Sequence, residues 1–281
     1  MLKNLTIIFN AYFSQQSLIK VLKNLKNFKI IIIENSLQQK IKTELEKKYK
    51  NVNVIIPSHN LGLAKGYNLG ISKAKTKYVF LNTPDMLIKS RSIKKLLTLS
   101  KKIKKLGIIS PRYDDEKNFK NYIINKNSSD KGQLLLVDSI DNNFLINKKL
   151  VKNNLFDENY FLYFETVDFC LNLKRNGLKL FVAKNVFFKH FHSRSVDKKY
   201  DKIVKKIRAW HYNWSKFYYY RKNFNYIYAI TKILPNFYQS IKNFIINFFK
   251  LDFFKSKLNL IEIYGIISAV MCLKSFYRAK K

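Results

Sequence analysis

The sequence predicts an α/β protein with a doubly wound, mixed sheet and a helical C-terminal extension. The first hundred residues alternate short apolar runs with helical patterns, as in sheets built from right-handed βαβ units. Short alternating runs over 113–155 then indicate antiparallel strands. From about residue 200 the pattern is helical only and dense in Tyr, Phe and Lys. We therefore expect one domain at 1–200 and a basic, aromatic, helical extension at 201–281.

The elements of the first domain follow from apolar periodicity. Short runs rich in Ile, Val, Leu or Phe predict strands at 5–9, 29–33, 52–56, 78–82 and 107–110. Helical spacing predicts helices between them, at 17–25, 37–49, 63–74 and 90–105. Later runs predict strands at 120–124, 133–140, 179–183 and 186–190, and an aromatic-rich stretch from 157 that becomes helical up to 176. Ligands of such sheets bind beyond the carboxyl ends of the strands, so the residues after each strand are the site candidates.

Composition limits the class of protein. Lys and Arg total 54 against 18 acidic residues, a formal net charge of +36 that favours anionic partners such as nucleic acid, anionic lipid or a phosphorylated substrate. Lys, Asn and Ile are overused throughout, so background composition explains the excess equally well. The apolar fraction of 47% argues against disorder, and two cysteines cannot make a disulfide scaffold. They fit a reducing compartment.

Neither end of the chain suggests a targeting or membrane-spanning segment. The apolar run 5–9 is too short for a signal peptide and reads as a strand. Near the C-terminus the longest uncharged apolar stretch, 263–273, falls well short of the roughly 20 residues that a spanning helix needs.

Acidic residues in apolar surroundings are the first candidates for chemistry, because burying an unpaired carboxylate is unfavourable. Asp85 follows the predicted strand 78–82, where it could hold Mg²⁺ or Mn²⁺ or simply form a Pro-Asp turn. Glu165 and Asp168 are three residues apart at a predicted helix start, where they could include a general base or could cap the helix. His190 ends a predicted strand and could be a metal contact or a structural histidine.

The segment 60–70 follows the predicted strand 52–56 and enters a helix. It reads Asn-Leu-Gly-Leu-Ala-Lys-Gly-Tyr-Asn-Leu-Gly. Its glycines would let backbone N–H groups approach a ligand closely, and the start of a helix favours phosphate. The spacing matches neither the Rossmann nor the P-loop pattern.

Taken in order, these segments resemble the family 2 glycosyltransferases, in particular the bacterial rhamnosyltransferase-like branch with a GT-A fold. The resemblance covers roughly residues 1–200. Six pieces carry it in order along the chain: a first strand at the nucleotide edge, Ile-Glu-Asn-Ser at 33–36, the run 60–70, Leu-Asn-Thr-Pro-Asp at 81–85, the aromatic and acidic run 156–170, and a His followed five residues on by Ser, at 190 and 195.

The resemblance implies a set of site residues. It implies donor contacts at Asn10, Glu34, Asn35, Asn60, Gly62, Asn68 and Asn82. Asp85 would be the metal carboxylate and His190 a further contact to Mn²⁺ or Mg²⁺. At the acceptor end, Glu165 or Asp168 would be the general base, with Glu165 preferred slightly.

Three positions depart from the family pattern. Glu34 replaces an Asp and lengthens the arm by one methylene. Thr83 is an extra residue before Pro-Asp, which alters the turn that carries the metal carboxylate. Thr166 replaces the Asp that is the usual base, so the base must be Glu165 or Asp168 if the protein is active.

The function implied is inverting transfer of a sugar from a nucleotide-diphosphate donor to a saccharide, lipid-linked or free, in cell-surface polysaccharide synthesis. The extension at 201–281 would lie on an anionic membrane surface at the cytoplasmic face, or pack on the domain or form a dimer. Two alternatives stay open: an inactive glycosyltransferase-like scaffold, suggested by Thr166, and a basic, aromatic nucleic-acid binder. The sequence has no RNP-type motif, so we expect no nucleic-acid partner.

Overall fold

The computed structural model describes residues 2–115, 120–124, 130–151, 155–190 and 195–279 of the 281-residue chain. These residues form two compact units. The first consists of Met1–Leu61, Lys65–Phe156 and Thr166–Lys198. The second consists of Gly62–Ala64, Asp157–Glu165 and Lys199–Lys281, so it adds two short segments to the C-terminal helices.

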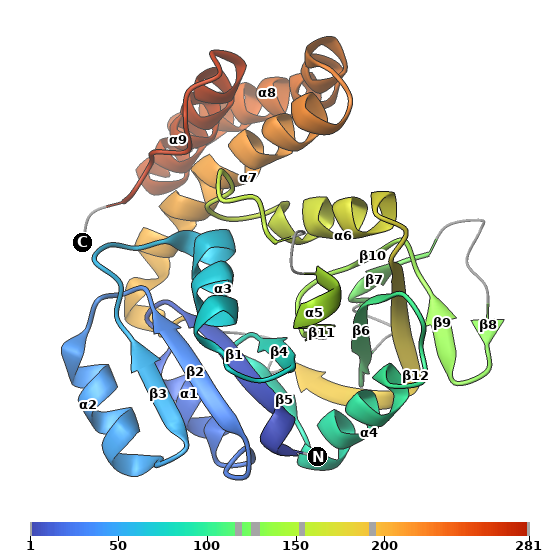
Figure 1. Ribbon diagram of the computed structural model, residues 1–281. Coiled ribbons are helices and arrows are strands. Elements are labelled where there is room, and N and C mark those ends of the chain that lie inside the picture. Colours follow the sequence, from blue (N-terminus) through green and yellow to red (C-terminus); the bar gives the residue numbers. More distant parts are fainter. Residues whose placement is uncertain (1, 116–119, 125–129, 152–154, 191–194, 280–281) are drawn as a thin grey trace. The chain divides into compact units, whose positions relative to one another are not determined.

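The first unit is organised around one large sheet (Figure 1). Its strands are β1 Leu5–Ala11, β2 Lys29–Glu34, β3 Val52–Ile55, β4 Tyr78–Asn82, β5 Met86–Ile88, β6 Leu106–Tyr113, β8 Asp130–Lys131, β9 Leu134–Leu136, β11 Phe144–Asn147 and β12 Lys179–His190. The spatial order is β3-β2-β1-β4-β11-β6-β12-β9-β8, and β5 pairs with β12. A separate pair joins β7 Tyr122–Ile123 to β10 Ser139–Ile140.

Strand direction brings several chain segments to one edge of the sheet. β1, β2, β3 and β4 are parallel, β11 is antiparallel to both β4 and β6, and β12 is parallel to β6. The carboxyl ends of β1, β2, β4, β6 and β12 therefore lie at the same edge as the beginning of β11. The expected fold class, α/β with a doubly wound mixed sheet and a helical C-terminal region, is confirmed.

Helices cover both faces of this sheet. They are α1 Gln15–Leu22, α2 Gln39–Lys48, α3 Gly62–Lys73, α4 Ser90–Ser100, α5 Lys148–Val151 and α6 Glu165–Arg175. Apolar residues of α1, α2 and α4 share one buried cluster with Ile7 and Phe9 of β1. On the opposite face, Gly70 of α3 lies against Ile8, and Gly107 of β6 lies against Leu173 of α6. Nearly every residue of β1 is buried, and successive side chains point to opposite faces, so both faces of the sheet are covered by helices.

Three sequence-based assignments need correction. The strands expected at 179–183 and 186–190 are one strand, β12, whose pairing with β6 is irregular between Val182 and Phe187. Polar Lys184 and Asn185 interrupt the apolar run there, but the backbone continues through a bulge. The strand expected at 133–140 is two strands, β9 and β10, in different sheets. The short strands β5 and β11 were not expected at all.

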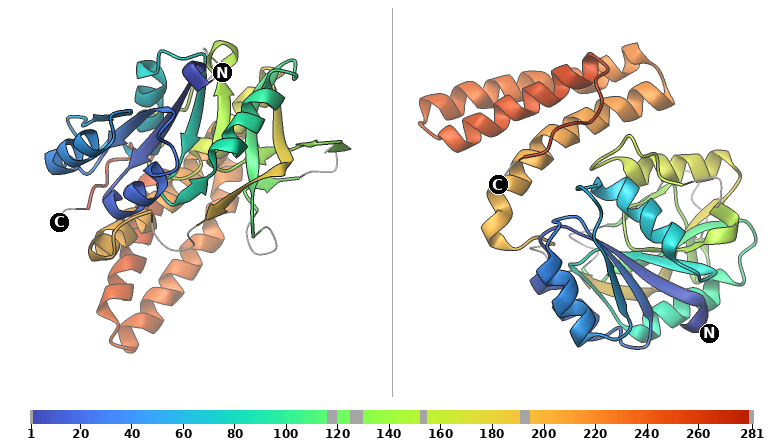
Figure 2. Two further views of the ribbon diagram at one scale, coloured as in Figure 1. Left: turned by 90° about the horizontal axis from the view of Figure 1, so that it is seen from below. Right: turned by 60° about the vertical axis from the view of Figure 1, so that its left-hand side comes forward.

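The second unit is a helical assembly of α7 Asp201–Asn223, α8 Tyr226–Phe249 and α9 Phe253–Val270. α8 and α9 lie side by side as a hairpin, drawn in orange and red in Figure 2. The core of the second unit contains Trp210, Trp214 and Phe217 of α7 with Ile233 of α8 and Ile266 of α9. Among the residues that the structure describes, no helix is both long enough and apolar enough to cross a membrane.

The short segment 157–165 is tied to α7 by several polar contacts. Asp157 Oδ2 accepts hydrogen bonds from Lys222 Nζ at 2.8 Å and from the Tyr218 hydroxyl at 3.0 Å. The Ser215 hydroxyl donates to the Leu162 carbonyl at 2.8 Å. These bonds explain why this loop belongs to the helical unit, although about 40 residues separate it from α7 in sequence.

Candidate active site

Asn35 joins the ends of β1 and β2 to the start of α3 at the carboxyl edge of the sheet. Its backbone N–H donates to the Ala11 carbonyl at 2.8 Å, and its side-chain Nδ2 donates to Asn10 Oδ1. The Asn35 Oδ1 accepts the backbone N–H of Leu61 at 2.9 Å. Asn10 and Asn35, two of the predicted donor contacts, are therefore brought together and fixed by one network.

Glu34, the residue before Asn35, is fully buried and turned into its own loop. Its carboxylate accepts hydrogen bonds from the Ser36 hydroxyl at 2.5 Å, from the Ser36 N–H at 3.3 Å and from the Gln38 N–H at 3.3 Å. Burial raises the pKa of the Glu34 carboxyl, and these hydrogen bonds oppose that rise. Glu34 therefore stabilises the loop that presents Asn35, and its contact to a nucleotide stays a prediction.

Asn68 of α3 is committed to the backbone of a distant segment. Its Nδ2 donates to the Phe156 carbonyl at 2.9 Å, and its Oδ1 accepts the Phe156 N–H at 3.1 Å. These two hydrogen bonds hold the backbone of Phe156 at the start of the aromatic-rich segment. We infer that Asn68 positions this segment, and its contact to the donor stays a prediction. Asn60 is half-buried, immediately before Leu61.

The glycines of the segment 60–70 have packing reasons of their own. Gly62 has φ of +74°, and an added Cβ would overlap the carbonyl oxygen of Phe161. That same oxygen accepts the Leu63 N–H at 2.7 Å. One turn further, an added Cβ at Gly66 would overlap the Asn10 side chain. Close helix packing thus explains Gly62 and Gly66 without a phosphate ligand.

Asp85 and His190 meet at the same edge of the sheet. The chain turns after β4, where the Met86 N–H donates to the Thr83 carbonyl at 3.2 Å, so Pro84 and Asp85 occupy the centre of the turn. β5 then pairs antiparallel with β12, with Met86 opposite His190. This register places His190 Nε2 3.2 Å from Asp85 Oδ2. The extra residue Thr83 is thus accommodated as the first residue of the turn.

The surroundings of Asp85 favour its ionised form. Burial alone would raise the pKa of this carboxyl, but hydrogen bonds from His190 and Thr83, together with attraction to His190, outweigh burial and hold the pKa below its usual value. The beginning of β11 supports the turn, because Asn143 Oδ1 accepts the Thr83 N–H at 2.9 Å. Asp85 is therefore a fixed carboxylate, the kind of group that binds a hard cation.

The structure adds three residues that the sequence analysis missed: Tyr113, Asp141 and Asn143. The Tyr113 ring stacks on His190 with ring centroids 5.7 Å apart. Its pKa is raised, first by burial and then by the negative charges of Asp141 and Asp85. These groups therefore form one electrostatic cluster at the carboxyl edge.

Asp141 is reached by solvent, yet the surrounding protein removes enough hydration to raise its pKa. Hydrogen bonds from the Asn142 backbone and the Thr166 hydroxyl oppose the rise, and the charge of Asp85 adds to it. The residue that departs from the family pattern, Thr166, is thus a hydrogen-bond donor to a second carboxylate.

A signal for these residues was present in the sequence. The run Asp141-Asn142-Asn143 stands directly before the apolar strand β11. Asn142 and Asn143 have φ of +20° and +60°, and Asn is among the few residues other than Gly that adopt this region readily. An Asp-Asn-Asn run before an apolar run therefore indicates a tight turn at a strand start, and because β11 is antiparallel to β4 and β6 this start lies at the edge where those strands end.

Glu165 and Asp168 stand in the first turn of α6, and both side chains are buried. Glu165 is grouped with the second unit and Asp168 with the first. Within the described ranges, no three His, Cys, Asp or Glu side chains are close enough to hold a metal ion by themselves. Any cation at Asp85 and His190 would take its other ligands from substrate or water.

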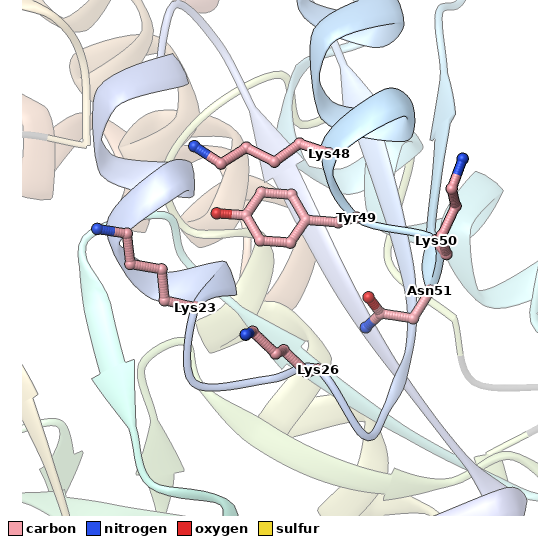
Figure 3. A pocket seen from close by; sticks show the side chains of 6 residues that line it. All are labelled: Lys23, Lys26, Lys48, Tyr49, Lys50 and Asn51. Carbon is pink, nitrogen blue, oxygen red and sulfur yellow. The ribbon is translucent and has the colours of Figure 1, made fainter.

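The opposite edge of the sheet carries a basic pocket of about 560 Å³, shown in Figure 3. Lysines 23, 26, 48 and 50 surround Tyr49 and Asn51. The Asn51 Nδ2 donates to the carbonyls of Leu25 and Phe28, and the Tyr49 hydroxyl donates to the Ile19 carbonyl at 3.3 Å. The side chains of Tyr49 and Asn51 are therefore used in hydrogen bonds that stabilise the fold. The pocket lies at the segments that precede β2 and β3, away from Asp85.

Comparison with known proteins agrees with this fold. The family model "Glycosyl transferase family 2" matches residues 6–167. No curated protein sequence matches the chain. The fold is similar to that of mannosyltransferase PcManGT from Pyrobaculum calidifontis in complex with GDP-Man and Mn²⁺, at 10% identity and a TM-score of 0.56 over 95% of this chain and 87% of that chain.

Two further solved structures have the same fold. S. aureus TarS 1-349 in complex with UDP-GlcNAc is 13% identical with a TM-score of 0.53, over 98% of this chain and 93% of that one. GalNAc-T7 with UDP, GalNAc and Mn²⁺ is 12% identical with a TM-score of 0.58, over 78% of this chain and 50% of that one.

A mixed central sheet covered by helices is the α/β fold that this chain shares with these solved structures. The chain belongs to glycosyl transferase family 2, because the family model spans more than half of it.

Proposed function

We propose that this protein transfers a hexosyl or rhamnosyl group from a nucleotide-diphosphate sugar to a saccharide acceptor, with inversion and with a divalent cation, in cell-surface polysaccharide synthesis. The acceptor we favour is lipid-linked, and the place of action is the inner face of the cytoplasmic membrane. Family membership supports the transferase class. The rhamnosyltransferase-like branch is part of the proposal.

The observation that carries the proposal is the Asp85–His190 pair beside the Asn10–Asn35 network. The two side chains are 3.2 Å apart. Neighbouring ligands of an octahedral ion with bonds of about 2.1 Å stand roughly 3 Å apart, so Asp85 Oδ2 and His190 Nε2 have the spacing of two ligands of one Mn²⁺ or Mg²⁺ ion once His190 Nε2 has given up the proton that it donates to Asp85. Among the described residues, the buried Asn82 Oδ1 has no hydrogen-bond partner, which supports a ligand at this edge.

The donor would lie with its diphosphate at Asp85 and its nucleoside toward Asn10 and Asn35. When bound, a divalent cation would neutralise the charge that develops on the leaving diphosphate. Asp85 fits this because its carboxyl is held ionised, and His190 orients it through the 3.2 Å contact. The network from Asn35 to Asn10 and Leu61 keeps the nucleoside end rigid, which lowers the entropy lost on binding.

The acceptor hydroxyl must lose a proton as the new glycosidic bond forms. We assign this base to Glu165 or Asp168, with Glu165 preferred, since both are buried carboxylates in the first turn of α6. A positioned base contributes about 10² to 10⁴ in rate. Asp141 is a third candidate, because the Thr166 hydroxyl hydrogen-bonds to it.

The test is hydrolysis or transfer of nucleotide sugars with and without Mn²⁺. GDP-Man and UDP-GlcNAc begin the panel, because similar folds were solved with them. A thermal-shift screen selects the donor, since a ligand at 100 times its Kd adds about 2.7 kcal/mol to stability. Donor binding without turnover would favour the inactive scaffold. If neither Asp85→Ala nor Glu165→Ala lowers activity, the site assignment is wrong.

A further inference from the structure

The α8–α9 hairpin exposes large apolar side chains in addition to those that it buries against α7. Large apolar side chains are exposed along α8 at Ile227, Leu234, Tyr238, Ile245 and Phe249. Their spacing alternates between seven and four residues, which places all of them on one side of a helix with 3.6 residues per turn. This side of α8 is therefore an uncovered apolar stripe.

α9 repeats the pattern. Phe253, Leu260, Tyr264 and Met271 are exposed and follow the same steps of seven and four residues. A helix that faces water normally turns its apolar stripe to the core. Two adjacent helices with the stripe outward therefore need an apolar environment outside the hairpin.

The inside of the same hairpin is polar near its tip. The Ser240 hydroxyl of α8 donates to Glu262 Oε2 of α9 at 2.9 Å, and Asn259 Nδ2 donates to the same oxygen at 3.1 Å. Asn247 Nδ2 donates to Asn259 Oδ1 at 2.9 Å. Hydrogen bonds between helices with apolar side chains outside are the arrangement that a lipid environment favours.

The turn at the tip is rigid and presents three apolar side chains to solvent. The Leu251 N–H donates to the Phe248 carbonyl at 3.0 Å, and the Asp252 N–H donates to the Asn247 carbonyl at 2.9 Å, which is the Schellman arrangement. Asp252 then caps α9 by accepting the Lys255 N–H at 3.1 Å. The turn is therefore saturated with hydrogen bonds.

Leu251 occupies the position where glycine is usual, with φ of +57°. A leucine is strained there, and its side chain is 72% exposed, between Phe249 at 78% and Phe253 at 64%. Neither backbone geometry nor packing within the described residues explains a leucine at this apex. A partner outside the chain does.

The charges around the tip indicate which partner. Residues 242–257 contain four lysines and one aspartate, a net charge of +3, and Asp252 is already paired with Lys255 at 2.8 Å. A second copy would bring the same positive charge against it, which disfavours self-association. Anionic lipid offers both an apolar interior and complementary charge.

We propose that the tip of the α8–α9 hairpin, Phe248–Phe253, inserts into the interfacial layer of an anionic bilayer, with the apolar stripes of both helices lying along that layer. The described helices do not cross a membrane, so attachment is to one leaflet. This proposal specifies how the membrane attachment in the proposed function would occur, and it rests on the place of action proposed there. It does not depend on transferase activity.

The main experiment is co-sedimentation of the full chain with phosphatidylcholine vesicles that do or do not contain phosphatidylglycerol. The variant Phe249→Ser/Leu251→Ser/Phe253→Ser is expected to bind anionic vesicles about 10³-fold more weakly, since each of the three buried side chains contributes about tenfold. The control Ile123→Ser/Leu150→Ser/Phe187→Ser alters equally large exposed side chains of the first unit and leaves binding unchanged. Equal binding by wild type and tip variant, or equal loss in the control, overturns the proposal.

The charge contribution is measured separately with Lys250→Gln/Lys257→Gln. Each lysine near an anionic surface contributes about fivefold in affinity, so binding falls on phosphatidylglycerol vesicles as salt is raised and as the lysines are removed. Binding that is indifferent to both changes would contradict an anionic surface.

Insertion itself is read from a fluorophore at the apex. Leu251→Cys is labelled with an environment-sensitive dye in a Cys272→Ser background, because Cys272 is exposed and Cys170 is buried. A blue shift with anionic vesicles supports insertion, and an unchanged spectrum refutes it. If the wild type instead sediments as a dimer that the triple serine variant dissociates, with no vesicle binding, the hairpin is a self-association surface.

Two readouts keep folding and catalysis apart from membrane binding. Trp210 and Trp214, the chain's two tryptophans, lie in the core of the second unit, so unchanged tryptophan emission shows that the variant is folded. Donor hydrolysis without lipid is expected to be unchanged in the tip variant. If the wild type hydrolyses donor but does not bind vesicles, this inference is wrong and the proposed transferase activity stands. If the wild type binds vesicles but hydrolyses no donor, the proposed activity is wrong and this inference stands.

Discussion

Two glycines on one face of α3 give matched substitutions, of which only one is expected to weaken donor binding. Gly66 and Gly70 are one helical turn apart, and alanine fits both backbones because neither has a positive φ. At Gly66 the added Cβ meets the Asn10 amide, which accepts the Asn35 hydrogen bond. At Gly70 it meets the Ile8 Cγ2 at 2.5 Å, inside the core.

The effects on stability are of similar size. Replacing a mid-helix glycine by alanine stabilises by about 1 kcal/mol. Gly66→Ala displaces Asn10 and loses the hydrogen bond to Asn35, which costs about 1–3 kcal/mol where a buried donor is left unsatisfied. Gly70→Ala overpacks Ile8, which costs about 1–3 kcal/mol. Each variant should therefore be destabilised by about 0–2 kcal/mol, as measured by denaturant unfolding.

Donor affinity should separate the two variants. Gly66→Ala moves Asn10 and frees Asn35, so loss of about one hydrogen bond to the donor weakens binding about tenfold, whereas Gly70→Ala leaves affinity unchanged. Calorimetry with the donor chosen by thermal shift, in Mn²⁺, measures both. In an Asn10→Ala background the effect of Gly66→Ala should vanish, since the collision is gone. Equal weakening by both glycine variants would refute the assignment of Asn10 and Asn35 to the donor site.

Three further outcomes are expected. Asp85→Ala should lower the transfer rate by about 10² to 10³-fold in Mn²⁺ and abolish the response to Mn²⁺, whereas full retention in a steady-state assay would remove Asp85 from the metal site. Asp141→Asn removes a negative charge that acts on Asp85, so the Mn²⁺ concentration for half-maximal activity should rise several-fold; an unchanged Mn²⁺ titration would separate Asp141 from the site. His211 is buried as the neutral form, with its pKa lowered from 6.5 to about 3, so the unfolded chain binds its proton first as pH falls. Stability should drop by about 2 kcal/mol between pH 8 and pH 5, and this part of the drop should be absent in His211→Gln; equal urea midpoint shifts in both proteins would contradict it.

The sheet and the order of the candidate residues could be predicted from the sequence because both depend on local signals. The four isoleucines of β2 and the apolar spacing of α1 and α4 encode burial on a strand or on one helical face, whatever the rest of the chain does. Parallel strands with helical crossovers then require residues that follow each strand to meet at one edge. Asp85 was found by that argument, whereas Asn35 was identified only through the resemblance to the family pattern.

The parts that the sequence did not yield depend on pairings between distant segments. β11 is a short strand whose place between β4 and β6 is decided by the sheet, and that insertion brings Asn143 beside Thr83. The family resemblance implied one cation for Asp85 and His190, but their direct contact joins residues 105 positions apart, and the contact of Asn68 with Phe156 joins residues 88 apart. No local pattern contains such pairs, because their free energy comes from packing and from satisfying buried polar groups.

The C-terminal helices show the same division. The sequence by itself determined that the segment after residue 200 is helical, basic and aromatic, since helix propensity and composition are local properties. Only the tertiary structure decided which side of each helix is covered: α7 buries Trp210 and Trp214, while α8 and α9 turn Ser240 and Asn259 inward and leave their apolar stripes outside. Periodicity identifies a stripe, but the partner that covers it is decided by the packing of the whole chain and its surroundings.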